Sequence, residues 1–384
     1  MVNKRSDFEH LILSPGTKPT DFLSYVEWER SLDRLRAKRC RRLRIRSSSS
    51  HASEARTFGI FDRAVNKHPG CVPLWIAYLD FAAQVKASKR WRKIVTRALR
   101  LHPTNAQLWT LAGRRAALNG DMERARGHFL RGCRFCTGEA TLWIEYARCE
   151  MQWLARVEAK KGGKDVRRGV NPAEAIKATE GGEDDGDHIA LDDGDSDEDS
   201  DNDGELMLPD PDADQGDRKS KPKAMDAEAA RKIAESPALN GAIPIAIVEH
   251  ARLQSFWGPA TAEAFFDCFA AFGATVSVHG RVVQHVLTIM EETWPNSPST
   301  CSCQIRHPLV GVDAHSAAFP KALGESLAKL KEAFERTEDK KALALKMIVW
   351  ADTILAVEGL DEAIRQVLEL TKGRLQAVVE AASS

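Results

Sequence analysis

The chain has 384 residues, eight of them cysteines, and its 55 basic side chains are matched by 55 acidic ones. This length exceeds that of one compact domain, and no run of about 18 apolar residues predicts a membrane span. The first residues, MVNKRSDFEH, lack the apolar core of a signal peptide, and the scattered cysteines are typical of reduced thiols rather than of a disulfide framework.

Basic and acidic residues are segregated along the chain. Residues 1–170 carry 35 Lys and Arg against 16 Asp and Glu, whereas residues 171–217 carry 1 against 19. Residues 218–384 carry 19 against 20. We therefore expect an anionic partner to bind the N-terminal part of the chain.

Residues 1–50 are predicted to form basic helices that include the first helix of a repeat, with Phe22 and Tyr25 on its packing face. The stretch RLRAKRCRRLRIR follows, with eight basic residues in thirteen. A helix that is basic all round cannot be buried, so the stretch is a candidate for binding phosphate or an acidic partner. A nuclear targeting patch and an ordinary solvated face are the alternatives. The candidate residues are Arg34, Arg36, Lys38, Arg39, Arg41, Arg42, Arg44 and Arg46.

Residues 51–160 repeat a pattern every 34 residues, marked by Trp75, Trp109 and Trp143. A leucine precedes each tryptophan, and apolar residues at helical spacing predict two helices per unit. One pair of helices cannot bury its apolar face alone, so the units are predicted to stack into an α-solenoid. The aromatic columns are interpreted as packing residues between helices, with base stacking as the alternative. The second column holds Tyr78, Ala112 and Tyr146.

Residues 161–236 are predicted to be a long disordered acidic insertion within a repeat, because few apolar residues stand among many like charges. Ser196 and Ser200 each precede an acidic residue by three positions, which makes them candidate phosphorylation sites; a solvating linker is the alternative. Residues 237–384 are predicted to be helical, with a loop over residues 296–316 and a break near Gly373 left open.

Catalytic and metal-binding motifs are missing from the sequence. It has no G-x-S-x-G, phosphate-binding P-loop or H-E-x-x-H motif, so we expect neither an enzyme nor a cofactor. Cys133 and Cys136 form a lone C-x-x-C pair, and Cys301 and Cys303 lie near His307. Neither group offers the four ligands of a structural zinc site, and we predict no metal.

The repeats resemble half-a-tetratricopeptide repeats, because LWIEYARCE places Trp143, Tyr146 and Glu150 in a W-x-x-Y-x-x-x-E pattern. Three segments, KRSDFEHLI (4–12), KPTDFLSYVEWERSLDRLRAKRCRRL (18–43) and FGIFDRAVNKHPGCVPLWIAYLDFA (58–82), together resemble the U3 small nucleolar RNA-associated protein 6 family. Members of that family usually carry a further helical stretch before the first segment, so the chain is expected to be a shortened member.

The resemblance implies an all-α half-a-tetratricopeptide solenoid that acts as a non-catalytic scaffold of the nucleolar small-subunit processome. Such a subunit serves pre-ribosomal RNA processing and the maturation of small-subunit ribosomal RNA. The implied partners are other processome subunits, many of them β-propeller proteins, with U3 RNA and pre-ribosomal RNA contacted directly or indirectly. No membrane and no small-molecule substrate are implied. A scaffold of splicing or messenger 3′-end formation, or a direct RNA-binding module using the basic helix, remain alternatives.

Overall fold

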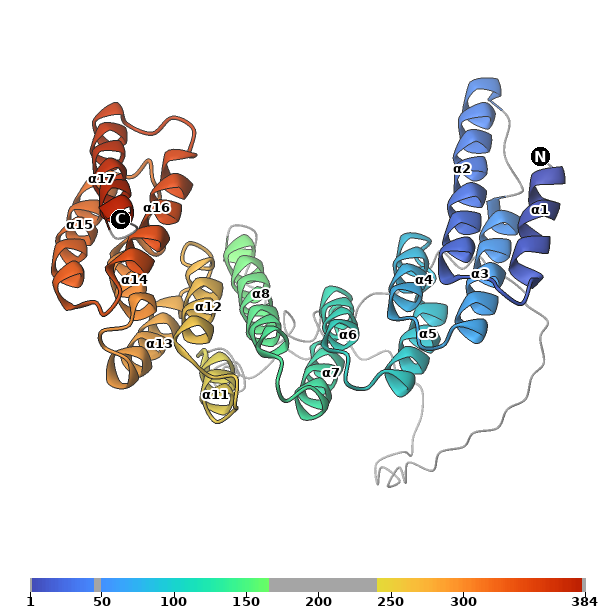
Figure 1. Ribbon diagram of the computed structural model, residues 1–384, viewed down its shortest axis with the longest axis horizontal. Helices are drawn as coiled ribbons and strands as arrows, with labels where there is room; N and C mark the ends of the chain where they lie inside the picture. Colours follow the sequence, from blue (N-terminus) through green and yellow to red (C-terminus); the bar gives the residue numbers. More distant parts are fainter. Residues whose placement is uncertain (1, 45–49, 166–239, 382–384) are drawn as a thin grey trace.

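Helices form all the regular structure of residues 2–44, 50–165 and 240–381, which are the residues described by the computed structural model (Figure 1). The predicted all-α class is confirmed. The elements are α1 (Val2–Leu13), α2 (Pro19–Leu43), α3 (Ser50–Lys67), α4 (Val72–Gln84), α5 (Ser88–Leu101), α6 (Ala106–Leu118), α7 (Met122–Phe135), α8 (Ala140–Asp165), α11 (Ala242–Arg252), α12 (Pro259–Ala270), α13 (His279–Thr293), α14 (Pro298–Arg306), η1 (His307–Leu309), α15 (Phe319–Arg336), α16 (Lys340–Leu355) and α17 (Glu362–Ala381).

The helices pack as consecutive pairs, α2 with α3, α4 with α5 and α6 with α7. The C-terminal pairs are α12 with α13, α14 with α15 and α16 with α17. Figure 1 shows the pairs following one another in chain order around an open arc. The first helices α4, α6, α8 and α12 line the inner side of the arc, and α5, α7, α11 and α13 lie on its outer side.

The 34-residue period has a structural cause in the turns between units. The indole nitrogen of Trp75 donates to the carbonyl oxygen of Pro69 at 2.9 Å, and that of Trp109 donates to Pro103 at 2.7 Å. His102 Nε2 lies 2.7 Å from the same Pro69 oxygen. Each proline carbonyl therefore ties the end of one unit to the first helix of the next.

A second repeated contact joins each tyrosine of the second column to the helix that precedes its own. The tyrosine ring stacks on a phenylalanine with centroids about 5 Å apart and ring planes within 8° of parallel. In α6, Ala112 occupies the position of the tyrosine. Gly113 beside it leaves room for the ring of Phe129, because a Cβ atom added at Gly113 would lie only 2.4 Å from that ring. The stacked pairs are Phe8–Tyr25, Phe61–Tyr78 and Phe129–Tyr146.

The helix pair α8 and α11 is made from segments on either side of residues 166–239. The predicted insertion thus falls between the two helices of one pair, although residues 166–236 themselves lie outside the described residues. Helix α8 continues to Asp165, beyond the predicted start of the insertion at Lys161. The Glu158 carboxylate accepts hydrogen bonds from the backbone and hydroxyl of Ser277 at 2.9 and 2.8 Å, so α8 is fastened to the C-terminal repeats.

The structure corrects the predicted loop at residues 296–316. Pro298 begins α14, a nine-residue helix in which Cys301, Cys303 and Ile305 are fully buried. Ser299, Thr300 and Ser302 are buried as well, so small polar residues occupy buried positions and obscure the apolar–polar periodicity of this helix. Helix α17, in contrast, runs through Gly373 without a break.

Candidate partner-binding surface

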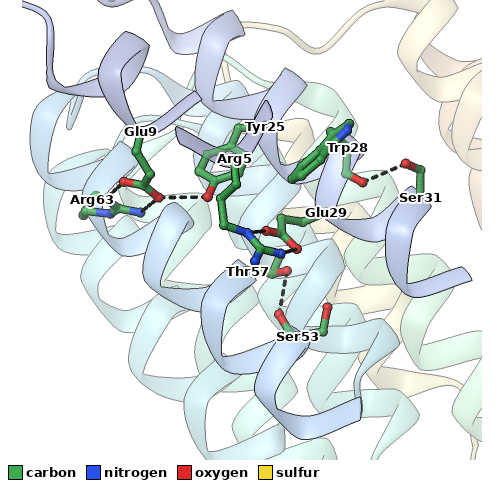
Figure 2. A network of polar contacts seen from close by, with 9 residues as sticks. All are labelled: Arg5, Glu9, Tyr25, Trp28, Glu29, Ser31, Ser53, Thr57 and Arg63. Carbon is green, nitrogen blue, oxygen red and sulfur yellow. Dashed lines mark hydrogen bonds and ion pairs between the residues drawn. The ribbon is translucent and has the colours of Figure 1, made fainter. Parts of the chain in front are cut away.

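A polar network fixes α1 against α2 and α3 at the N-terminal end of the array (Figure 2). Arg5 donates to both carboxylate oxygens of Glu29, at 2.7 and 3.2 Å, and Glu29 is 1 % exposed. Glu9 accepts from Arg63 at 2.7 and 3.1 Å and from the Tyr25 hydroxyl at 2.8 Å. The hydrogen bond from Arg63 lowers the pKa of Glu9, and burial raises the pKa of Tyr25 to about 12.

The same arginine–glutamate pairing recurs at the junction of α7 and α8. Arg126 donates to both oxygens of Glu150 at 2.7 and 2.9 Å, across the same 24-residue interval as the N-terminal pair. Each guanidinium also lies over an indole, with Arg126 5.2 Å from the ring centre of Trp153 and Arg5 5.8 Å from that of Trp28. In both pairs the glutamate is buried and the arginine is partly exposed, and removal of the arginine would leave a buried charge without its counterion.

The aromatic columns predicted from the repeats face the interior. Seven of the eight side chains are buried, and Trp143 is half-buried. The seven buried side chains therefore offer no surface on which bases could stack. The buried residues are Phe22, Tyr25, Trp75, Tyr78, Trp109, Ala112 and Tyr146.

The basic half of α2 extends away from the array (Figure 1). From Arg34 to Arg44 every basic side chain is exposed, and Arg46 lies outside the described residues. Two apolar side chains share this part of the helix: Leu35 is 52 % exposed and Leu43 is 67 % exposed. We call residues Arg34–Arg44 the α2 tip. It combines positive charge with uncovered apolar area.

The paired cysteines Cys133 and Cys136 are both buried. Burial raises the pKa of Cys133 to about 12 and also raises the pKa of Cys136, so both thiols are protonated at neutral pH. Within the described ranges no three His, Cys, Asp or Glu side chains could jointly hold a metal ion, and no helix is both long and apolar enough to span a bilayer. The candidate phosphorylation sites Ser196 and Ser200 fall outside these ranges.

The sequence interpretation overlooked a second basic surface, on α5. This helix, SKRWRKIVTRALRL, contains no acidic residue, and its apolar side is buried against α4 and the next unit. The absence of acidic residues from this segment is evident in the sequence. The position of α5 on the outer side of the arc (Figure 1) could be known only from the fold.

Comparison with known proteins finds a similarity in the N-terminal part of the chain. Residues 1–67 match the family model described as U3 small nucleolar RNA-associated protein 6. This region is therefore similar to that family. The segment contains α1, α2 and α3, and thus the network of Figure 2 and the α2 tip.

Curated proteins of the same name are similar over a longer part of the chain. The protein from Schizosaccharomyces pombe is 34 % identical over 164 residues, which are 42 % of this chain and 34 % of that protein. The Homo sapiens homolog is 29 % identical over 169 residues, or 42 % of this chain and 28 % of that homolog. The Mus musculus homolog is 27 % identical over 186 residues, or 46 % and 31 %. The chain thus covers about a third of the length of the curated relatives that it matches.

Proposed function

We propose that this protein is a non-catalytic scaffold subunit of the nucleolar small-subunit processome. It would act with the U3 ribonucleoprotein in pre-ribosomal RNA processing and in the maturation of small-subunit ribosomal RNA. The observation that carries the proposal is the combination of an N-terminal family match with an open array of helix pairs. The aromatic side chains of the array are used for packing, so its exposed faces are available to partners.

The α2 tip is the proposed contact with another subunit. Stable protein interfaces bury apolar side chains at their centre within a polar rim, and the tip offers Leu35 and Leu43 among its arginines. A partner surface with acidic groups around an apolar groove would complement it. The family resemblance suggests β-propeller subunits for this role, and a nuclear, nucleolar location follows from the proposal.

An enzymatic role is not part of the proposal. The cysteines at C-x-x-C spacing have raised pKa values. The buried glutamates Glu29 and Glu150 are neutralised by arginines and serve packing. Cleavage of RNA would belong to other factors.

Affinity capture of the tagged full chain from cells, read out by mass spectrometry and RNA sequencing, tests the proposal. We expect enrichment of U3 RNA and processome subunits. Glutamine substitution of Arg36, Arg39, Arg41 and Arg42 in the α2 tip should reduce subunit recovery.

The matched control replaces four exposed lysines near α15 by glutamine, with the same change in net charge, and should leave recovery unchanged. Enrichment of spliceosomal or messenger 3′-end RNAs in place of U3 would overturn the assignment. The control lysines are Lys321, Lys329, Lys331 and Lys340.

A further inference from the structure

The exposed face of α5 carries positive charge that the fold does not use. Of the six basic residues of this helix, two contact polar side chains of α3. Arg90 lies 3.5 Å from Asp62, and Arg97 donates to Asn66 at 2.5 Å while lying over Trp75. These two side chains help to join α5 to the preceding helices.

The other four basic side chains, Lys89, Arg92, Lys93 and Arg100, are exposed. None of them forms an ion pair with another described residue. Positions three, four and eleven residues apart fall on one face of an α-helix, so the four charges form a single stripe. With a rise of about 1.5 Å per residue the stripe is roughly 16 Å long.

Neither folding nor solubility accounts for the stripe. Like charges three and four residues apart destabilise a helix by a few tenths of a kcal/mol. Solubility is achieved by interspersed charges of both signs. Helix α15 has such a surface, with Glu325, Lys329, Lys331 and Glu332 all exposed.

We propose that the α5 stripe binds the phosphate backbone of RNA. A row of cations without acidic residues suits a polyanion, which binds by releasing counterions and requires no apolar contact. Only Leu101, at the end of α5, adds exposed apolar area. This distinguishes the stripe from the α2 tip, where two leucines favour a protein partner.

The neighbouring outer helix extends the same surface. Helix α7 follows α5 on the outer side of the arc (Figure 1), and its Arg131 and Arg134 are exposed, whereas Arg124 lies 3.3 Å from Asp121 in an ion pair. An RNA strand lying across the outer side would therefore meet further positive charge after α5. The proposal goes beyond the scaffold function, which requires protein contacts and does not require this chain to touch RNA.

Fluorescence anisotropy with the purified full chain tests the proposal. The probes are a labelled oligouridine and a mixed-sequence single-stranded RNA of equal length, titrated over a range of salt concentrations. We expect both RNAs to bind with similar affinity, because backbone contacts carry no sequence information. Replacing Lys89, Arg92, Lys93 and Arg100 together by glutamine should weaken binding roughly tenfold and reduce the slope of log affinity against log salt by about 3.

Two charge-matched variants separate this proposal from the scaffold function. The quadruple variant at Lys321, Lys329, Lys331 and Lys340 should bind RNA as the wild type does. If the α2-tip variant loses RNA binding while the α5 variant keeps it, the α5 proposal is wrong and the scaffold proposal is unaffected. Tighter binding of an acidic peptide of equal charge than of RNA would assign the stripe to a protein partner and also overturn the proposal. Circular dichroism of each variant monitors folding.

Discussion

Replacement of Trp75 by phenylalanine probes the contact that sets the repeat period. Trp75 is fully buried, and its indole nitrogen donates to the Pro69 carbonyl at 2.9 Å. Loss of this hydrogen bond costs about 1 kcal/mol, and the smaller ring leaves a cavity that costs about 1–2 kcal/mol. His102 remains 2.7 Å from the Pro69 oxygen, so that oxygen keeps a partner. We expect a total destabilisation of about 2–3 kcal/mol.

The equivalent change at Trp143 is the matched control. Trp143 is half-buried, and its indole nitrogen has no acceptor among the described residues. Phenylalanine removes this unsatisfied donor, which gains up to about 1 kcal/mol and offsets the lost ring contacts. The net effect should lie within about 1 kcal/mol of zero. The two substitutions should thus differ by about 2 kcal/mol, or about 30-fold in a local opening equilibrium.

Hydrogen exchange measured by mass spectrometry on the full chain is the appropriate assay, because the stability of a solenoid is distributed among its units. Trp75→Phe should accelerate exchange in α4 and α5, whereas Trp143→Phe should leave exchange in α8 near the wild-type rate. Equal acceleration at the two sites would refute the reasoning, since the indole–proline bond would then contribute nothing.

Three further substitutions test packing and charge. Gly113→Ala should destabilise α6 and α7 by about 1–3 kcal/mol in urea unfolding, because the added methyl meets a phenylalanine ring; wild-type stability would contradict this packing. Glu150→Ala should lower the free energy of unfolding by about 2 kcal/mol. This is less than the loss of a fully buried pair would cost, because the Arg126 side chain is 29 % exposed. An unchanged urea midpoint would show that the pair does not contribute to stability. Arg63→Gln should cost less than about 1 kcal/mol at pH 7. Arg63 lowers the folded-state pKa of Glu9, so its stabilisation is present above the unfolded pKa and is lost as the pH falls through the folded value. The difference in unfolding free energy between wild type and Arg63→Gln should therefore shrink below about pH 4, and a constant difference would exclude this linkage.

Sequence spacing was sufficient to predict the helix pairs because each unit buries the same few side chains. The tryptophan and tyrosine columns recur every 34 residues, and most of these side chains are buried inside the array. The indole–proline hydrogen bonds were not predictable in the same way, because they depend on how the turn before each helix folds back.

Helix α14 was missed for a different physical reason. Spacing predicts a helix when apolar residues mark its buried side, and in α14 serine, threonine and cysteine occupy buried positions in place of larger apolar residues. The α2 tip was identified from its composition. Its separation from the rest of the array and the exposure of Leu35 and Leu43 became apparent only with the arrangement of α2 relative to α3.

The pairing of α8 with α11 has a consequence for chain cleavage. These helices belong to one continuous apolar core that draws on residues from both sides of 166–239. A protease cut within that interval would break the covalent link but leave the interlocking surfaces in place. The two fragments should then remain associated as a split protein, and separately expressed pieces ending and starting there should reassemble on mixing.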